Sequence, residues 1–391
     1  MEKVTRKIAD SLRAVEKWVE DHDYMGYEPF DGLSSVLRPL TFDNLFMERL
    51  LQQLVRQSPI NLRPLLGVRP QESTKGRGYM GWGYLTMLKV TGDGSYRDKA
   101  AACLGWLAEN SSPYYDELSW GNHFDFSSRG GKLPKLEPII VWTSLIGQAC
   151  LDAYEQIGDE KYLNMSRSIM DWISALPREK TASGDCLSYV RYQQSSIHNS
   201  NMLGAAFLAR GASVTGDGKM MEVARSAMEY SCTRQLEDGA WWYGDAPMYH
   251  WVDNFHTGYN LDSLKCYIES SGDETWRDNL VKGLAFFKDN FFEQDGLPKY
   301  YHNRAYPVDI QCASQAVTTL ALFAEEDPEC LELGVKVANW IIDNMQTRKG
   351  YFIYRIYPWG RATTPMLHWG QATMYKGLTL LYARLMEKRE G

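Results

Sequence analysis

The sequence predicts an all-α fold, an (α/α)6 toroid of six helical hairpins, with short β-hairpins in the long loops on one rim. Three observations predict it: a Gly-Asp motif recurs along the chain, an apolar helix precedes each copy, and an amphipathic helix follows it. The copies begin at Gly92, Gly158, Gly216 and Gly272, and Glu326 takes the glycine's place in a fifth. Self-similarity at such a period is typical of a repeat architecture.

Each repeat is expected to contain one buried and one half-exposed helix. The helix before the motif is rich in Ala, Gly and Leu and apolar almost all round, which is typical of a buried helix. The helix after it, such as 219–235, has one polar face and belongs on the outside. Glycine at the end of the first helix indicates a tight C-terminal turn.

The ends of the chain complete the ring. We expect a last inner helix from Thr373 to Met386 and an N-terminal helix that pairs with the first inner one. The repeat length does not distinguish a closed toroid from an open solenoid, but the absence of polar capping repeats favours closure. One domain covering residues 1–391 is therefore predicted.

Composition excludes several classes of function. The net charge is −7 and no long basic run occurs, which argues against binding to nucleic acid. The seven cysteines are widely spaced and form no CxxC pair, so we expect reduced thiols and a cytoplasmic protein. No signal-peptide core and no apolar run of membrane-spanning length occurs. No cofactor is expected, and assembly of identical chains stays open.

Polar residues gather where each inner helix begins, on the rim with the long loops. An inner helix is otherwise apolar, and a buried polar group costs about 1–3 kcal/mol unless it is paired. Repetition of that cost at one end of the ring indicates a shared pocket, although Asp253 and Asp309 also suit helix N-caps. The candidate catalytic residues are Asp125, Tyr243, Asp253, His256, Asp309 and His368. The candidate substrate-binding residues are His123, Arg129, His198, Asn201, Trp241, Asn254, Tyr259, Gln311, Arg355, Trp369 and Gln371.

Aromatic and basic loop residues indicate the kind of ligand. The chain has 13 Trp and 24 Tyr, and many of them lie in Gly-rich loops, where they suit stacking on the apolar faces of sugar rings. Arg129 and Arg355 suit a sugar carboxylate, because arginine binds carboxylates through two parallel hydrogen bonds. We therefore expect a glycan or oligosaccharide ligand that carries uronate groups.

Several segments together resemble one family. HFDFSSR, SIHNSNMLGAAFLAR, QLEDGAWWYGDAP, WVDNFHTGYNLDSL and YPVDI, with DYMGYEPFDGL and NLRPLLGV, look like VpsJ-like proteins of surface-polysaccharide biosynthesis. This resemblance implies a cytoplasmic α/α toroid connected with glycan assembly or modification, and it carries over no catalytic residue. The C-terminal third is also similar in layout to the toroid domains of glucuronyl C5-epimerases and uronyl hydrolases, an analogy of architecture alone.

Two other toroid chemistries fit less well. The stretch from Gln235 to Trp241 looks like a squalene-cyclase repeat, but the DxDD acid of that family does not occur. Toroidal prenyltransferases hold zinc with Asp, Cys and His. Asp309, Cys312 and His368 have these types, but the first two stand three residues apart where that motif has two. We predict no metal site.

Three functions remain. An epimerase or β-eliminating lyase removes a proton next to a carboxylate and needs a base and a cation; His256 and Tyr243 are the candidate bases, and Arg129 and Arg355 the cations. A glycoside hydrolase needs two carboxylates, available here from Asp125, Asp245, Asp253 and Asp309, while Glu is scarce in the rim segments. A non-catalytic glycan-binding or assembly protein would need only aromatic and amide side chains.

Overall fold

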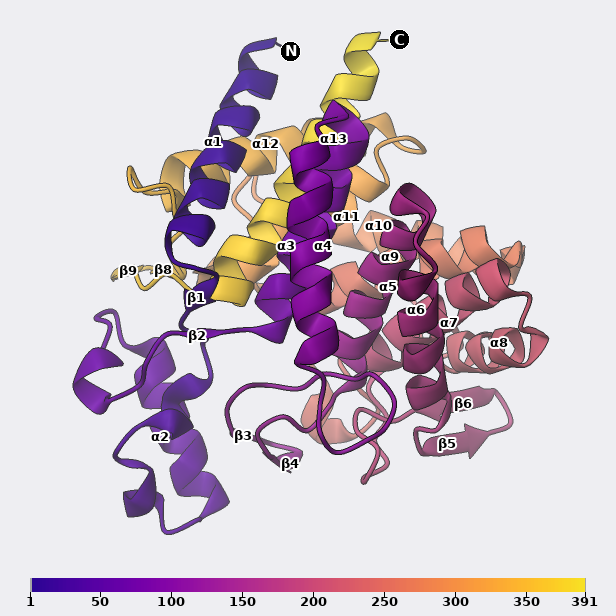
Figure 1. Ribbon diagram of the computed structural model, residues 1–391, viewed down its shortest axis with the longest axis horizontal. Helices are drawn as coiled ribbons and strands as arrows, with labels where there is room; N and C mark the ends of the chain where they lie inside the picture. Colours follow the sequence, from indigo (N-terminus) through magenta and orange to yellow (C-terminus); the bar gives the residue numbers. More distant parts are fainter. Residues whose placement is uncertain (1, 391) are drawn as a thin grey trace.

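The computed structural model describes residues 2–390 and is mainly helical. The inner helices of these residues are α3 (Thr74–Thr91), α5 (Ile140–Ile157), α7 (His198–Thr215), α9 (Asn254–Ser271), α11 (Ile310–Leu322) and α13 (Thr373–Glu390). The outer helices are α1 (Glu2–Asp21), α4 (Gly94–Glu109), α6 (Glu160–Ser174), α8 (Gly218–Cys232), α10 (Arg277–Asn290) and α12 (Pro328–Met345). A further helix, α2 (Leu45–Gln57), lies beside the ring, at the lower left of Figure 1.

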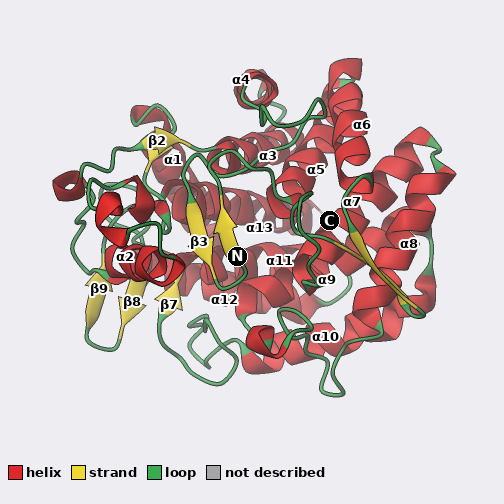
Figure 2. Ribbon diagram, turned by 90° about the horizontal axis from the view of Figure 1, so that it is seen from below, coloured by secondary structure: helices red, strands yellow, loops and turns green. Residues whose placement is uncertain are grey.

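The inner helices form a closed ring. Each packs against the next, and α13 packs against both α11 and α3. The outer helices surround them, so that Figure 2 shows one ring of helices inside another. This confirms the predicted toroid. The pairing of the N-terminal helix differs from the prediction: α1 packs on α13 and α12 and covers the outer side of α13.

The recurring Gly-Asp motif makes the short turns. Gly92, Gly158, Gly216 and Gly272 end their helices with φ between 68° and 77°, the left-handed region that glycine adopts at little cost. The aspartate after each glycine caps the next helix by accepting hydrogen bonds from backbone N–H groups. In the fifth repeat the glycine is missing, but Asp327 still caps α12.

The long loops form the opposite rim and carry short antiparallel strands, which Figure 2 shows in front of the ring. The strands are β1 (Met25–Gly26), β2 (Gln71–Glu72), β3 (Phe126–Ser128), β4 (Gly131–Leu133), β5 (Arg178–Thr181), β6 (Gly184–Leu187), β7 (Val308–Asp309), β8 (Arg355–Tyr357) and β9 (Gly360–Ala362). They pair as β1–β2, β3–β4, β5–β6 and β7–β8–β9. The short helical turns are η1 (Asp31–Ser34), η2 (Arg38–Thr41), η3 (Pro64–Leu66), η4 (Pro247–Tyr249), η5 (Glu274–Trp276) and the π-helix η6 (Leu367–Ala372), which leads into α13.

A hydrogen bond crosses the centre of the ring. The hydroxyl groups of Tyr79 on α3 and Tyr259 on α9 lie 2.8 Å apart, and both side chains are buried. In the closed ring two inner helices separate α3 from α9 in each direction, so this pair spans the ring axis. The pair forms a floor below the rim of long loops.

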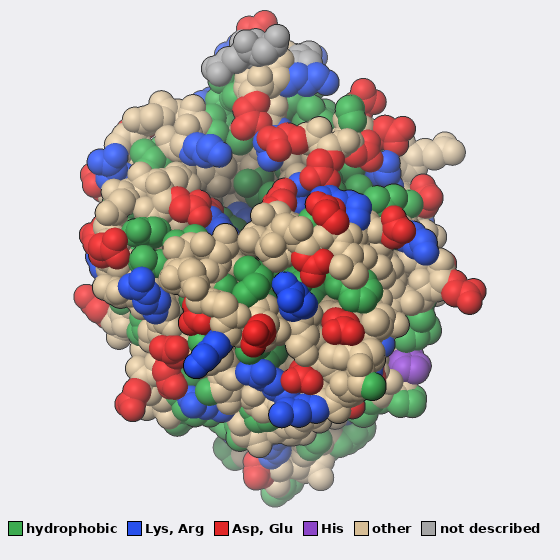
Figure 3. Space-filling model, turned by 90° about the vertical axis from the view of Figure 1, so that its right-hand side faces the viewer, with side chains coloured by type: hydrophobic (Ala, Val, Ile, Leu, Met, Phe, Trp, Pro, Cys, Tyr) green, Lys and Arg blue, Asp and Glu red, His purple; other side chains and the backbone are tan. Residues whose placement is uncertain are grey.

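The described surface adds two observations. None of the helices within residues 2–390 combines the length and the apolar run that a membrane crossing needs. Figure 3, which faces the right-hand side of Figure 1, shows acidic and basic side chains interspersed rather than a continuous basic patch. That face therefore offers no electrostatic footprint for nucleic acid.

Ring closure can be tested at Gly83. A Cβ atom at this position of α3 would come within 2.6 Å of the Tyr375 ring on α13, whereas a Cβ at Gly94 would meet nothing within 4 Å. Gly83→Ala should lower the free energy of unfolding by about 1–3 kcal/mol through overpacking. Gly94→Ala should leave it unchanged or slightly raised. Equal stability of the two variants in denaturant titrations would contradict the contact between α3 and α13.

Candidate active site

One buried side chain from the start of each inner helix lies at the long-loop rim. Five of them carry polar atoms that have no hydrogen-bond partner among the described residues: Trp142 Nε1, Asn199 Oδ1, Asn254 Oδ1 and Nδ2, Gln311 Oε1 and His368 Nε2. The sixth is Lys75, whose Nζ has no hydrogen bond or ion pair within residues 2–390 and lies 3.8 Å from the Trp142 ring centroid. Unpaired buried polar groups are rare in proteins, so their concentration here indicates a ligand site.

The first histidine–carboxylate pair joins His368 and Glu28. His368 Nδ1 is hydrogen-bonded to Glu28, and the backbone N–H of His368 donates to the same carboxylate at 3.3 Å. Burial lowers the pKa of His368 to about 4, so the ring is neutral at physiological pH. Its Nδ1–H then donates to Glu28, and Nε2 keeps a free lone pair. His368 Nε2 can therefore accept a proton from a ligand.

The second pair joins His256 and Asp253. Asp253 caps α9, and its carboxylate accepts from His256 Nδ1 at 2.7 Å and from His256 N at 3.0 Å. Trp251 Nε1 holds the same carboxylate at 3.0 Å. The imidazole thus has a fixed orientation with Nε2 free for a substrate, and the side chain keeps 19% exposure. Tyr243 lies with its ring centroid 4.5 Å from that of His256, and burial raises its pKa well above the usual value, which suits a donor rather than a base.

An aromatic contact links the two pairs. Phe255 and Trp369, which adjoin the two histidines in sequence, lie with ring centroids 5.6 Å apart. Phe30, from the N-terminal loop, packs edge-on against Trp369 at 5.8 Å. The long-loop rim therefore carries two oriented imidazoles whose sequence neighbours belong to one aromatic cluster. Oriented imidazoles can remove a proton from a bound ligand and return one to it.

Asp309 and Arg355 neutralise each other. Their side chains form a buried ion pair, and Asp309 also accepts from Trp369 Nε1 at 2.8 Å and from Gln311 N at 2.9 Å. Asp309 therefore positions Trp369 and caps α11. The Arg355 guanidinium, which we predicted to bind a substrate carboxylate, has its counter-ion within the protein.

The structure shares its fold with carbohydrate-active enzymes. It aligns with a cellobiose 2-epimerase from Bacillus thermoamylovorans at a TM-score of 0.63, covering 81% of this chain and 88% of that one at 10% identity. A family 76 α-mannanase from Bacteroides thetaiotaomicron aligns at a TM-score of 0.63, covering 82% of this chain and 88% of that one at 12% identity. An α-1,6-mannanase from Salegentibacter in complex with α-1,6-mannotetrose aligns at a TM-score of 0.57, covering 81% of this chain and 91% of that one at 15% identity. Identities this low show the fold alone. No protein-family profile and no curated protein sequence matches the chain.

Some predicted residues lie at the site and others face away from it. His123 lies close enough to Glu28 and Lys75 to interact electrostatically with both, and burial lowers the pKa of His123 to about 4. His198, Asn201 and Trp241 face outward: the first two bond Ser231 of α8, and Trp241 Nε1 donates to its carbonyl oxygen. Gln371 bonds the backbone of Phe352 and Met366.

Asp125 and Arg129 lie at the β3–β4 hairpin and do not form an ion pair with each other. Asp125 pairs with Arg38 and accepts the backbone N–H of Lys135 at 2.8 Å. Arg129 lies in the exposed turn between β3 and β4, where it donates to the carbonyl oxygen of Met248 at 3.2 Å. Residues four apart would face each other in a helix, but this segment forms a hairpin.

Sequence reasoning missed Glu28, Lys75, Trp142 and Asn199. The last three could have been found, because they follow the same rule as the others and stand at inner-helix starts. Glu28 could not, since its partner lies 340 residues away. Within residues 2–390 no group of three or more His, Cys, Asp or Glu side chains is placed to hold a metal ion. Asp309 and His368, two of the residues considered for zinc, have separate partners.

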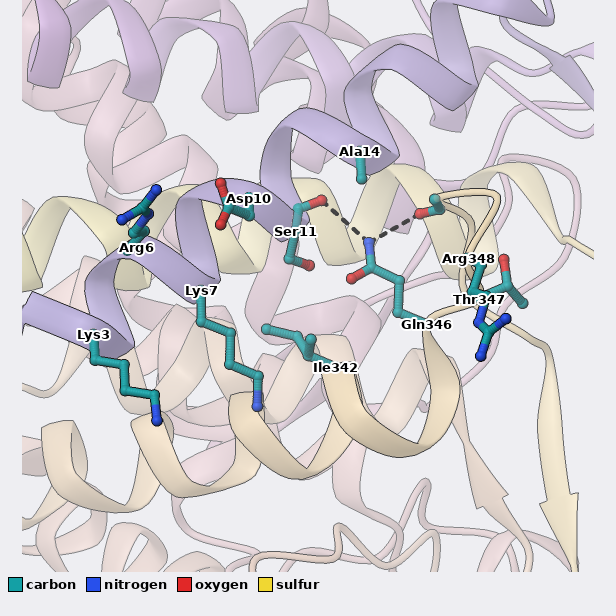
Figure 4. Close-up of a pocket in the computed structure, with 11 residues that line it drawn as sticks. Lys3, Arg6, Lys7, Asp10, Ser11, Ala14, Ile342, Gln346, Thr347 and Arg348 are labelled. Carbon is teal, nitrogen blue, oxygen red and sulfur yellow. Dashed lines mark hydrogen bonds between the residues drawn. The ribbon is translucent and has the colours of Figure 1, made fainter.

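A second hollow lies on the outer wall. It has a volume of about 410 Å³ and lies between α1 and the loop that follows α12, where Gln346 bonds the carbonyl oxygens of Ser11 and Gly350 (Figure 4). Its lining holds one carboxylate, Asp10, and no histidine. It offers no acid–base pair, so the rim cluster is the candidate active site.

The state of His368 can be measured directly. In NMR spectra of histidine-labelled protein, with the resonance assigned by His368→Gln, the ring should stay neutral with its proton on Nδ1 from pH 8 down to about 5. The reason is that burial lowers its pKa to about 4. A titration midpoint near or above the ordinary value of about 6.5 would instead identify an imidazolium ion paired with Glu28.

Proposed function

We propose that this protein is a sugar epimerase that removes and returns a proton at a carbon next to a carbonyl group. One observation carries the proposal: two imidazoles at the starts of inner helices are each held through Nδ1 by a carboxylate, leaving both Nε2 atoms for substrate. His368, neutral and buried, is the proposed base. His256, which is more exposed, is the proposed acid on the other face. The shared fold with a cellobiose 2-epimerase supports this reading.

The surrounding residues support binding of a carbohydrate. Trp369 and Phe255 offer apolar faces for a sugar ring, and Asn199, Asn254 and Gln311 have unpaired amide atoms for hydroxyl groups. Proton removal next to a carbonyl needs a positive charge or a donor at the developing oxyanion. Lys75 and the protonated Tyr243 are the proposed donors. A role in glycan assembly, as the VpsJ-like resemblance implies, fits such a reaction.

A glycoside hydrolase is less well supported. Its four candidate carboxylates already have partners: Asp125 with Arg38, Asp245 with His198 and Arg234, Asp253 with His256, and Asp309 with Arg355. The pKa of Asp245 is about 2, because hydrogen bonds from His198 and Tyr230 outweigh the effect of burial. A Salegentibacter mannanase is inactive when two adjacent aspartates are replaced, and no Asp-Asp pair occurs in this sequence.

We further propose that the sugar is acidic. Two arginines beside the site bond only uncharged groups within residues 2–390: Arg129 donates to the Met248 carbonyl oxygen, and Arg56 on α2 donates to the Tyr354 hydroxyl group. Arg129 lies 5.7 Å from the Trp251 ring centroid, and Arg56 lies 4.4 Å from that of Phe30. They replace Arg355 as the proposed carboxylate ligands. A β-eliminating lyase would use the same groups, and its unsaturated product would distinguish it.

The epimerase proposal is tested by proton exchange. Wild-type protein incubated in D2O with a panel of neutral and acidic reducing sugars should replace the hydrogen next to the carbonyl by deuterium and produce the epimer, as followed by NMR. His256→Gln and His368→Gln should each slow the exchange about 100-fold or more. His22→Gln, just after the outer helix α1 and hydrogen-bonded to the carbonyl oxygen of Trp18, is the control and should keep the rate. Release of new reducing ends without exchange would indicate a hydrolase.

The acidic-sugar proposal is tested by calorimetry. Arg129→Ala should weaken binding of an acidic oligosaccharide by about 1.5–3 kcal/mol, roughly tenfold or more, because one charge-assisted contact is lost. Binding of the matched neutral oligosaccharide should not change. Equal affinity of the wild type for both ligands would contradict an acidic substrate and leave the epimerase proposal standing.

A further inference from the structure

Lys75 is a buried amine that the proposed proton transfer uses only as a charge. Its side chain is 8% exposed, and it is the second residue of α3. Its Nζ contacts the face of Trp142, with no hydrogen bond or ion pair to any residue within 2–390. A lysine without a counter-ion in such surroundings is unusual, because buried charges are normally paired.

The surroundings favour the neutral amine. Burial disfavours the ammonium form, and the positive end of the α3 dipole does so too. The contact with Trp142 and the nearby carboxylate of Glu28 act in the opposite direction. Burial is the larger effect, and the pKa of Lys75 falls to about 7. A large fraction of the side chain is then the free amine at neutral pH, the form that attacks carbonyl carbons.

The amine also lies among groups that can move protons. Glu28, His123 and His368 are all close enough for their charges to act on one another and on Lys75. Trp142 contacts both the amine and His368, because the Trp142 ring centroid lies 3.8 Å from Lys75 Nζ and 5.2 Å from the centroid of the His368 ring. A small hollow beside Lys75, lined by Tyr79 and Trp142, has a volume of about 10 Å³, room for no more than about one water molecule.

We propose that Lys75 forms an imine with the carbonyl carbon of an open-chain sugar in the active site. The inference rests on the proposed function. The Nζ lone pair forms a bond to the carbonyl carbon, and the oxygen takes up a proton. A second proton transfer releases that oxygen as water, leaving a protonated C=N bond. Hydrolysis by the same steps frees the sugar. No oxidant or reductant is needed.

The imine has a clear use in this site. A protonated C=N bond withdraws electrons from the adjacent carbon more strongly than a C=O bond does. The proton on that carbon becomes more acidic, so His368 Nε2 removes it against a lower barrier, and the electron pair left behind is held as an enamine. Lys75 would thus be a catalytic residue, and substrates would have to carry a free aldehyde or ketone.

The test is reductive trapping. The full chain is incubated at pH 7 with D-glyceraldehyde or D-mannose and sodium cyanoborohydride, and adducts are located by mass spectrometry of peptides. We expect the Lys75 peptide to be labelled at least tenfold faster than peptides with exposed lysines, with a rate that rises through pH 7. Lys75→Arg should lose this adduct and keep the thermal unfolding temperature of the wild type.

Lys376 offers a matched control. It is also buried, with Nζ 3.8 Å from the Trp82 ring centroid, but Trp82 lies two helical turns beyond Lys75 on α3. Burial lowers its pKa to about 8, so low basicity alone would label both lysines. We expect no fast adduct at Lys376. Equal labelling of Lys75 and Lys376, or none at Lys75, would overturn the imine.

The outcomes separate this inference from the proposed function. A wild-type protein that exchanges deuterium but forms no adduct at Lys75 overturns the imine and leaves the epimerase. An adduct at Lys75 without exchange in D2O supports the imine and contradicts the epimerase. A Lys75→Arg variant that keeps the wild-type exchange rate also overturns the inference, because a guanidinium replaces the charge but forms no imine.

Discussion

Closure of the ring by α13 is the constraint on which the site depends. Because α13 packs between α11 and α3, six helix starts meet around one axis, and α1 is left to cover the outer side of α13. The Tyr79–Tyr259 hydrogen bond then spans that axis as a floor. Closure also brings the N-terminal loop against η6, so that Glu28 reaches His368 across almost the whole chain.

The same closure explains why the polar groups lie where they do. The inner helices bury apolar side chains along most of their length, and the start of each one from α5 onward carries a polar atom without a partner among the described residues. There each unpaired atom costs stability of about 1–3 kcal/mol, and a bound sugar would restore its hydrogen bonds. The carboxylates of Glu28 and Asp253 are hydrogen-bonded instead, and each one fixes the orientation of one imidazole ring. Rigid support of this kind is what oriented proton transfer requires.

The sequence predicted the fold well because the fold repeats. Gly-Asp turns and alternating buried and amphipathic helices identified the toroid, and the rule that polar residues begin inner helices found His256 and His368. The rule predicts how far along the ring axis a residue lies, but it does not predict whether its side chain points toward the axis or toward the outer helices. It therefore also selected His198 and Asn201, whose side chains point toward α8. Glu28 lies in a loop, and only tertiary contacts reveal its partner.

We propose that two histidines, supplied by opposite ends of the chain's second half, act on one carbon. A crystal structure of the protein with the open-chain alditol of its preferred sugar tests this most directly. We predict that the carbon next to the former carbonyl lies about 3–3.5 Å from His368 Nε2 on one face and from His256 Nε2 on the other. An alditol that contacts only one of these atoms, or that lies in the hollow between α1 and α12, would contradict the account.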